Sequence, residues 1–347
     1  MLNKNKILSL LFIFLCLHIG NVMADQENQH NVKYPRQTRV LLDSVNPQNM
    51  WDNLSILTQF PDRSSLDQNG VDAANWIKSQ LEILIKNSPR KDITIYTLNA
   101  YPDNDKDWPD NPKQPSIILK IGDSTKPAVV IGAHMDTKPL DTNSCSPQNC
   151  QGSDRMPGAD DDGSGTVAVL EEARVLLNSN ILFDKPVYLI FYAAEELGME
   201  GSRVVVDDFV QKKIAVEGVM QLDMIGLRYR NDPTIWLGSS KPDPEAPSSP
   251  TNSPILSAKV IALGHAYLSV PVRETEGDDM SDHLSWMRKD FKTVYLHERN
   301  CSEGGNCSGP THTADDTMDK LSLEHIANHL KLALAFTVEM AEPVSAK

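Results

Sequence analysis

The 347-residue chain lacks the features that mark several classes of protein. Basic residues are in deficit, with 33 Lys and Arg against 47 Asp and Glu, and the formal net charge is −14. This balance repels phosphate backbones and anionic lipid surfaces, which argues against a nucleic-acid partner. The 18 glycines and 22 prolines follow no period, which excludes a collagen-like chain, and a hydrophobic content of 40% argues against wholesale disorder. These absences leave a globular protein with enough chain to bury a core.

The apolar run near the N-terminus is too short to cross a bilayer. It covers 7–19, which is 13 residues, whereas a membrane-spanning helix needs about 20. Lys4 and Lys6 precede it, and Val22-Met23-Ala24 follows as a small-x-small cleavage site. This is the layout of a secretory signal peptide. We therefore expect residues 1–24 to be removed on export to a periplasm or the cell exterior, which leaves a mature protein without a membrane anchor.

The mature chain is predicted to have two parts. Residues 25–40 are polar and are expected to form a leader or short pro-segment. Residues 41–347 are expected to form one domain, because no linker divides them and no internal repeat is visible.

Cysteine is sparse, and its placement favours disulfides. One of the five cysteines, Cys16, lies in the signal peptide, and the other four form two close pairs in sequence, Cys145 with Cys150 and Cys301 with Cys307. An even count in an oxidising compartment favours two small-loop disulfides, although four cysteines allow three connectivities. A four-cysteine zinc site is the alternative, but it requires reduced thiols and more usual Cys-x-x-Cys spacing.

Apolar periodicity predicts an α/β fold. Helical spacing covers 72–85, 166–177 and 322–341, and strand patterns cover 93–98, 116–121, 128–134, 187–193 and 219–222. Because strands alternate with helices, we expect a single globular domain with a mostly parallel central mixed sheet sandwiched by helices.

Three of the predicted strands end in side chains that bind metals. The first runs into His134-Met135-Asp136, the second into Glu195-Glu196 and the third into Asp223. In open α/β sheets, ligands bind beyond the carboxyl ends of the strands. We therefore expect these side chains to gather at one edge of the sheet.

Two loops add further donors. Asp160, Asp161 and Asp162 are consecutive acids flanked by glycines, and such carboxylates repel one another unless a cation holds them. His312 lies in a polar loop before the last helix. A calcium loop is an alternative for the acids, but the closing glutamate of a helix-loop-helix calcium hand is missing. Imidazole and carboxylate together favour zinc, and a shared carboxylate makes a two-metal site.

The ordered motifs resemble the secreted co-catalytic zinc aminopeptidases of peptidase family M28. The resemblance covers about residues 45–342. It rests on six motifs: His134-Met135-Asp136, the 157–165 loop, Ala194-Glu195-Glu196-Leu197-Gly198, Gln221-Leu222-Asp223-Met224, Ser281-Asp282-His283 and Thr311-His312-Thr313.

The resemblance implies a role for each residue of the motifs. One zinc is bound by His134 and Asp223, the other by Glu196 and His312, and Asp161 bridges both. Two further acids, Asp136 and Asp162, support the ligands, and Asp136 orients the His134 imidazole. Glu195 is the implied general base. The resemblance also suggests a cis peptide after Asp161.

The implied activity is that of an exopeptidase with two zinc ions per chain. A zinc-bridging water would be the nucleophile, and Glu195 would move its proton to the leaving amine. Because the substrate's free α-amino group would bind one zinc, the implied substrates are peptides with a free N-terminus.

One segment departs from the leucine-preferring members of the family, which carry a disulfide and a tyrosine there. Here acids precede Ser281, and Glu276 or Asp278 facing the pocket would favour substrates with an N-terminal Lys or Arg. The alternative is that these acids form a solvated turn. Without the family's tyrosine, Tyr295 or His297 is a candidate to stabilise the tetrahedral intermediate.

Three other functions fit the sequence less well. A glutaminyl-peptide cyclotransferase would use a single zinc, whereas the full ligand set favours two. A carboxypeptidase would need a basic cluster for the substrate carboxylate, and none stands out near the motifs. A non-enzymatic binding module would be expected to have lost ligands, and here all five accompany the base.

Overall fold

An eight-stranded mixed sheet forms the centre of the protein in the computed structural model, which describes residues 32–100, 113–138, 155–238, 253–275, 280–297 and 310–344. Its strand order is β1-β2-β4-β3-β5-β8-β6-β7. The strands are β1 (Ile93–Asn99), β2 (Pro115–Ile121), β3 (Ala128–His134), β4 (Val187–Tyr192), β5 (Val216–Leu222), β6 (Ile235–Leu237), β7 (Val272–Glu274) and β8 (Thr293–His297). Strands β4, β3, β5 and β8 are parallel, whereas β1 and β2 pair antiparallel at one side and β6 pairs antiparallel with β8 at the other. The predicted α/β class and mixed sheet are confirmed.

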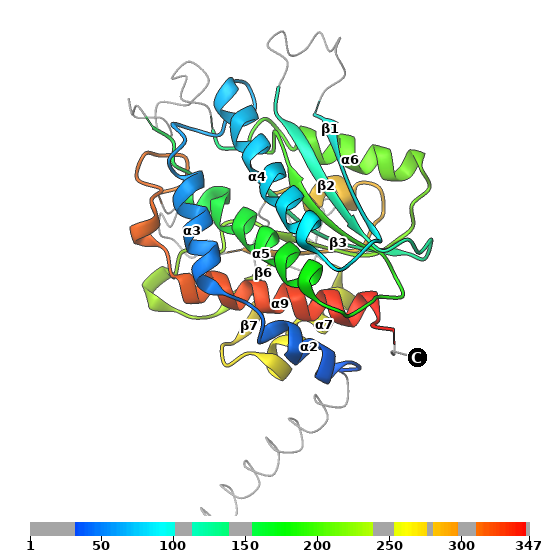
Figure 1. Cartoon of the computed structure of the whole chain (residues 1–347). Coiled ribbons are helices and arrows are strands. Elements are labelled where there is room, and N and C mark those ends of the chain that lie inside the picture. Colours follow the sequence, from blue (N-terminus) through cyan, green and yellow to red (C-terminus); the bar gives the residue numbers. More distant parts are fainter. Residues whose placement is uncertain are drawn as a thin grey trace, which may run out of the picture.

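Helices cover both faces of this sheet (Figure 1). Helices α3, α4, α5 and α9 form a layer on one face, and α6 lies against the other. The helices are α2 (Pro35–Leu42), α3 (Pro47–Leu57), α4 (Gln68–Asn87), α5 (Gly165–Asn178), α6 (Glu200–Gln211), α7 (Pro254–Tyr267), α8 (His283–Met287) and α9 (Leu323–Ala341), with shorter turns η1 (Ala159–Ser164), η2 (Tyr229–Asn231) and η3 (Met318–Lys320).

The central strands are buried on both faces. Every residue of β3 and β4 is buried, as expected for strands that read as continuous apolar runs. Val129 and Ile131 of β3 belong to the larger core cluster, whereas Val130 belongs to a smaller one that includes Phe209 and Trp286. Burial of each large apolar side chain stabilises the folded state by roughly 1.5–3 kcal/mol. The sheet is therefore a rigid support for the loops at its strand ends.

The sequence predicted three of the helices and five of the strands, and it missed helices such as α6 and α7 as well as the shortest strands. The three predicted helices are α4, α5 and α9, and the five predicted strands are β1 to β5. Helix α4 begins before the apolar pattern does, because the Asp67 carboxylate caps it by accepting from the N–H groups of Asn69 and Gly70. Strands β6 and β7 have three residues each, too few to show a period. Helix α2 lies partly within the stretch expected to be a leader, and its Leu41 is buried in the core.

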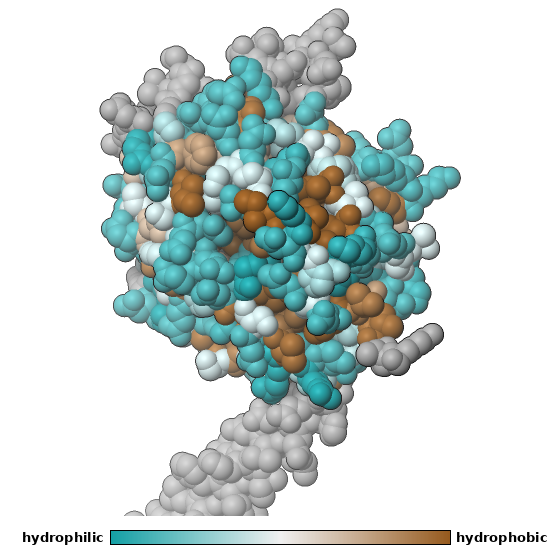
Figure 2. Space-filling view, in the orientation of Figure 1, coloured by the Kyte–Doolittle hydropathy of each residue, from teal (hydrophilic) through white to brown (hydrophobic). Residues whose placement is uncertain are grey.

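The outer surface of the helical layer is mostly hydrophilic, with separate apolar patches (Figure 2). Exposed apolar side chains on this layer include Ile56 of α3 and Ile83 of α4. Helix α3 packs instead against α5 and α9, and α4 packs against α5 and β2. Among the described helices, none has both the length and the apolar character needed to cross a membrane.

Candidate metal centre and active site

Side chains from three strand ends and two loops meet at one edge of the sheet, as the sequence predicted. His134 ends β3, Asp223 follows β5, and Asp161 lies in η1 before α5. The His134 Nε2 atom lies 3.1 Å from Asp161 Oδ1 and 3.5 Å from Asp223 Oδ1. These three donors are close enough together to hold one metal ion.

A second group of donors shares the same aspartate. The His312 Nε2 atom lies 2.9 Å from Asp161 Oδ2 and 3.1 Å from Glu196 Oε1. These three residues also form a group that could hold a metal. Each oxygen of the Asp161 carboxylate therefore faces a different group.

The donor set fits zinc. Each imidazole Nε2 faces two carboxylate oxygens, and its single N–H cannot satisfy both. Asp223 Oδ1 and Glu196 Oε1 are buried and accept no hydrogen bond from the described residues. Divalent zinc is bound by histidine nitrogen and carboxylate oxygen, and it would satisfy these atoms together.

Asp136 links two of the loops that carry the donors. Its carboxylate lies 3.5 Å from His134 Nδ1 and accepts from the backbone N–H groups of Glu195 and Glu196, at 3.1 Å and 3.3 Å. The sequence predicted that it orients His134, and the structure adds the contacts with the loop after β4.

The other acids of the 160–162 run hold backbone in place. Asp162 accepts from the N–H groups of His134, Gly165 and Met224. Asp160 accepts from Gly226 N at 2.7 Å. Only Asp161 of the three reaches both donor groups, and the Asp161–Asp162 peptide is cis, as the resemblance suggested.

Two contributors were missed in the sequence. Asp316 accepts from the N–H groups of Asp160 and Asp161, at 2.8 Å and 3.0 Å. Lys138 donates to Glu196 Oε2 at 2.7 Å and to its backbone oxygen at 2.9 Å. The only signal for either residue was its position, four residues after a predicted histidine ligand.

Burial and charge pairing shift the site's pKa values in opposite directions. Burial lowers the pKa of His312, but Asp161 and Glu196 outweigh it and raise that pKa to about 10. Burial also raises the pKa of the Glu195 carboxyl well above its usual range, and that of Asp316 to about 7. For Asp161, burial opposes ionisation, but hydrogen bonds from His134 and His312 lower its pKa.

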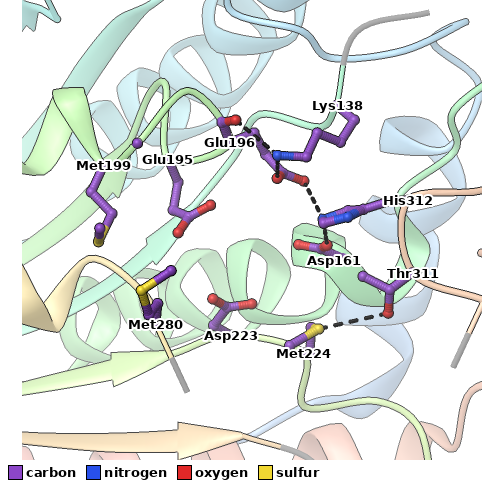
Figure 3. A pocket seen from close by; sticks show the side chains of 11 residues that line it. Lys138, Asp161, Glu195, Glu196, Met199, Asp223, Met224, Met280, Thr311 and His312 are labelled. Carbon is purple, nitrogen blue, oxygen red and sulfur yellow. Dashed lines mark hydrogen bonds and ion pairs between the residues drawn. The ribbon is translucent and has the colours of Figure 1, made fainter. Parts of the chain in front are cut away.

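A cavity of about 280 Å³ opens onto these groups. Figure 3 shows the Glu195 carboxylate pointing into it, apart from the Asp161–His312 contact. Met199 and Met280 lie on one side, Lys138 and His312 lie on the other, and Met224 lies beside Thr311. The lining comprises Lys138, Asp161, Glu195, Glu196, Gly198, Met199, Asp223, Met224, Met280, Thr311 and His312.

Some predicted site residues are not in this cavity. Tyr295 is 1% exposed and is stacked between the rings of His283 and His297, with centroids 4.5 Å and 4.6 Å away. The structure therefore does not bring Tyr295 or His297 to the described cavity wall. Six other predicted residues lie outside the described part of the chain: Glu276, Asp278, Cys145, Cys150, Cys301 and Cys307.

The chain is similar to known aminopeptidases along most of its length. It is 31% identical over 318 residues to leucine aminopeptidase 1 of Coccidioides posadasii, covering 89% of this chain and 75% of the relative. The crystal structure of Legionella pneumophila LapA aminopeptidase matches with a TM-score of 0.75 and 36% identity, covering 90% of this chain and 76% of that one. A zinc aminopeptidase from Bacillus subtilis matches with a TM-score of 0.51 and 25% identity, covering 67% and 52%.

The sequence model of peptidase family M28 matches residues 116–337, which is more than half of the chain and includes every donor of the two groups. The chain belongs to peptidase family M28.

Proposed function

We propose that this protein is a zinc-dependent aminopeptidase that removes the N-terminal residue from peptides. The observation that carries the proposal is the placement of Asp161, whose two carboxylate oxygens face two separate donor groups. His134 and Asp223 would complete one zinc site, and Glu196 and His312 the other. The similarity to leucine aminopeptidase 1 and to LapA aminopeptidase supports the same activity.

Zinc at these sites would supply Lewis acidity, which lowers the pKa of water and polarises the scissile carbonyl. The residues of the chain supply the placement of the donors. Asp136 and Asp162 bond to His134 and to neighbouring backbone, so the donor atoms are oriented before any ligand arrives.

Glu195 is the proposed general base. Its carboxylate lines the cavity but belongs to neither donor group, so it is available for proton transfer. It would take the proton of the attacking water and pass it to the leaving amine. The bond between Glu195 N and Asp136 Oδ1 fixes the backbone from which this side chain extends.

The cavity leaves room for a peptide N-terminus beside the two donor groups, which both lie in its wall. The free α-amino group of the substrate would bind at one of the two zinc sites. Such binding would limit attack to the N-terminal residue, and this is why we infer an exopeptidase.

The side of the cavity with Met199 and Met280 suits a long, unbranched or leucine-like side chain. These two residues present flexible thioethers that adapt to apolar shapes. They would also pack on the apolar stem of lysine. The proposed preference for N-terminal Lys or Arg therefore depends on the acids Glu276 and Asp278, and a strong preference for leucyl over lysyl arylamides would contradict it.

Export and disulfide formation are further proposals. They are supported by the signal-peptide layout of residues 1–24 and by the two close cysteine pairs. N-terminal sequencing of the secreted protein tests the first, and a mass shift on reduction tests the second.

Hydrolysis of leucyl- and lysyl-p-nitroanilide by the purified protein tests the function. We expect release of p-nitroaniline that chelation abolishes and zinc restores, with about two zinc ions per chain. A cyclotransferase would instead bind one zinc and release ammonia from glutaminyl peptides. That alternative is less well supported, because both donor groups are complete.

A further inference from the structure

Arg63 is buried beneath the metal centre although its side chain is charged. It is 1% exposed and lies between α3 and α4, in the segment of residues 61–65. A guanidinium group stays protonated in proteins, and burying one is costly unless its donors are satisfied. This segment precedes residues 116–337, the part that the family model matches.

The guanidinium bonds to the backbone of two loops that carry donors. Its Nε donates to the carbonyl of Met135 at 2.9 Å, and its two terminal nitrogens donate to the carbonyls of Pro157 and Gly158. Met135 lies between His134 and Asp136, and Gly158 directly precedes η1, which contains Asp161. One rigid planar group therefore spans the His134 loop and the Asp161 loop.

The rest of the segment extends this contact to the third loop. The Ser65 hydroxyl accepts from Ala194 N at 2.7 Å, directly before Glu195 and Glu196. Arg63 N also donates to the Thr137 hydroxyl at 2.9 Å. Residues 61–65 thus bond to the loops after β3 and β4 and to the loop before α5.

The packing around the guanidinium leaves little freedom. Gly158 has a φ of +52°, and a Cβ there would lie 2.4 Å from Thr137 Cγ2 and 2.9 Å from an Arg63 nitrogen. A Cβ there would also lie 2.5 Å from the backbone oxygen of Asp161. A side chain at this position would therefore shift the loop against Thr137, Asp161 and Arg63 together.

Burial and nearby carboxylates act in opposite directions on Arg63. Burial lowers the pKa of its guanidinium, and the carboxylates of Asp316, Asp162, Asp161 and Asp136 partly offset this effect. Its direct acceptors are carbonyls, however, so it does not compete with a metal for the carboxylate oxygens.

We propose that Arg63 is a positioning residue of the metal centre, which fixes the His134 loop relative to the Asp161 loop, and that Ser65 fixes the Glu195–Glu196 loop in the same way. The proposal rests on the proposed function, because it concerns the zinc sites named there.

The test compares Arg63→Lys and Arg63→Met with the wild-type protein. The zinc dissociation constant is measured by competition with a chelating indicator, after circular dichroism has shown that each variant is folded. Lysine keeps the charge but cannot span three carbonyls. We expect both variants to bind zinc about 10–100-fold more weakly, the usual cost of losing a group that supports metal ligands.

Arg90→Lys is the matched control. Arg90 is also buried, and it bonds to Asp92 and to the carbonyl of Ile181, outside the cavity. We expect its lysine variant to lower the unfolding temperature without weakening zinc binding.

Zinc binding by Arg63→Lys within twofold of wild type would overturn the proposal, as would an equal loss in Arg90→Lys. If the Arg63 variants do not fold, Ser65→Ala decides: weaker zinc binding by the folded variant supports the proposal, and unchanged binding overturns it. A wild-type protein that binds no zinc would instead refute the proposed function itself.

Discussion

Two groups of titratable side chains in this protein have very different surroundings. The first is the candidate metal centre, comprising His134, Asp161, Glu196, Asp223 and His312. The second, which we call the histidine column, consists of His283, His297, His325 and His329. In the column, Tyr295 stacks against His283 and His297, and His329 donates from Nδ1 to the carbonyl of His325 at 2.9 Å. In the first group, carboxylates of Asp161, Asp223 and Glu196 lie opposite the imidazoles.

The carboxylates decide what burial does to a histidine. Burial lowers the pKa of His283 to about 3 and that of His325 to about 4, because the charged form is poorly solvated there. At His312 the same effect is reversed by Asp161 and Glu196. Within the described residues, no three donors of the column are close enough to hold a metal. Histidine burial alone therefore does not mark a functional site, and substitutions in the two groups should have different consequences.

The largest expected effect comes from the shared carboxylate. Asp161→Asn removes the charge between both donor groups, so we expect zinc content to fall below one ion per chain and arylamide hydrolysis to be lost. Metal analysis and hydrolysis assays measure both. Two retained zinc ions would show that Asp161 is not shared.

Substitution of the proposed general base should lower kcat without changing the zinc content. We expect Glu195→Gln to lower kcat by about 10²–10⁴-fold, because it cannot accept the proton of water, while zinc content stays the same. Glu172→Gln is the matched control, since Glu172 is buried on α5 and bonds to Thr337 outside the cavity. A Glu195→Gln variant with wild-type kcat would exclude Glu195 as the base.

Substitution of Lys138 should have a smaller effect, because Lys138 influences zinc binding only through its ion pair with Glu196. Its ammonium holds Glu196 Oε2 and leaves Oε1 toward His312. We expect Lys138→Met to weaken binding of the zinc ion at the Glu196 and His312 site by about tenfold, measured by chelator competition. Lys185→Met is the control, because Lys185 is also paired with acids, Glu217 and Glu342, but does not line the cavity. Equal effects of the two substitutions would contradict a specific role for Lys138.

Substitutions in the histidine column should change the stability of the protein and leave its activity unchanged. His325 stays neutral in the folded protein down to about pH 4, whereas the unfolded chain takes up a proton below about pH 6.5. The free energy of unfolding therefore falls as the pH drops through this window, by about 1.4 kcal/mol per pH unit for this group. We expect His325→Leu to reduce that slope in denaturant titrations and to leave hydrolysis at neutral pH unchanged. An unaltered slope would contradict this assignment.

Sequence patterns predicted the donors because each one follows a recognisable strand or precedes a helix. His134 and Asp223 lie at the ends of apolar runs, where the fold class itself places ligands. Arg63, Asp316 and Lys138 have no such local signal. Arg63 contacts a carbonyl 72 positions away, and Asp316 contacts a backbone amide 155 positions away. Only tertiary packing turns them from ordinary charged residues into parts of the site.

Secondary structure was predictable in the same way: elements with a clear local pattern were predicted, and elements that depend on tertiary pairing were not. Long elements such as α9 and β3 have clear periods, whereas β8 is formed by five residues paired with β5 and β6 across the sheet. The role of Tyr295 could not be predicted, because its position in β8 places its ring between two histidines and away from the described cavity wall.

The sharing of Asp161 between two zinc ions is tested most directly by a crystal structure of the zinc-loaded protein, with anomalous difference maps recorded at the zinc absorption edge. We expect two peaks, one on either side of the Asp161 carboxylate: the first beside His134 and Asp223, the second beside Glu196 and His312. A single peak, or peaks away from Asp161, would contradict it.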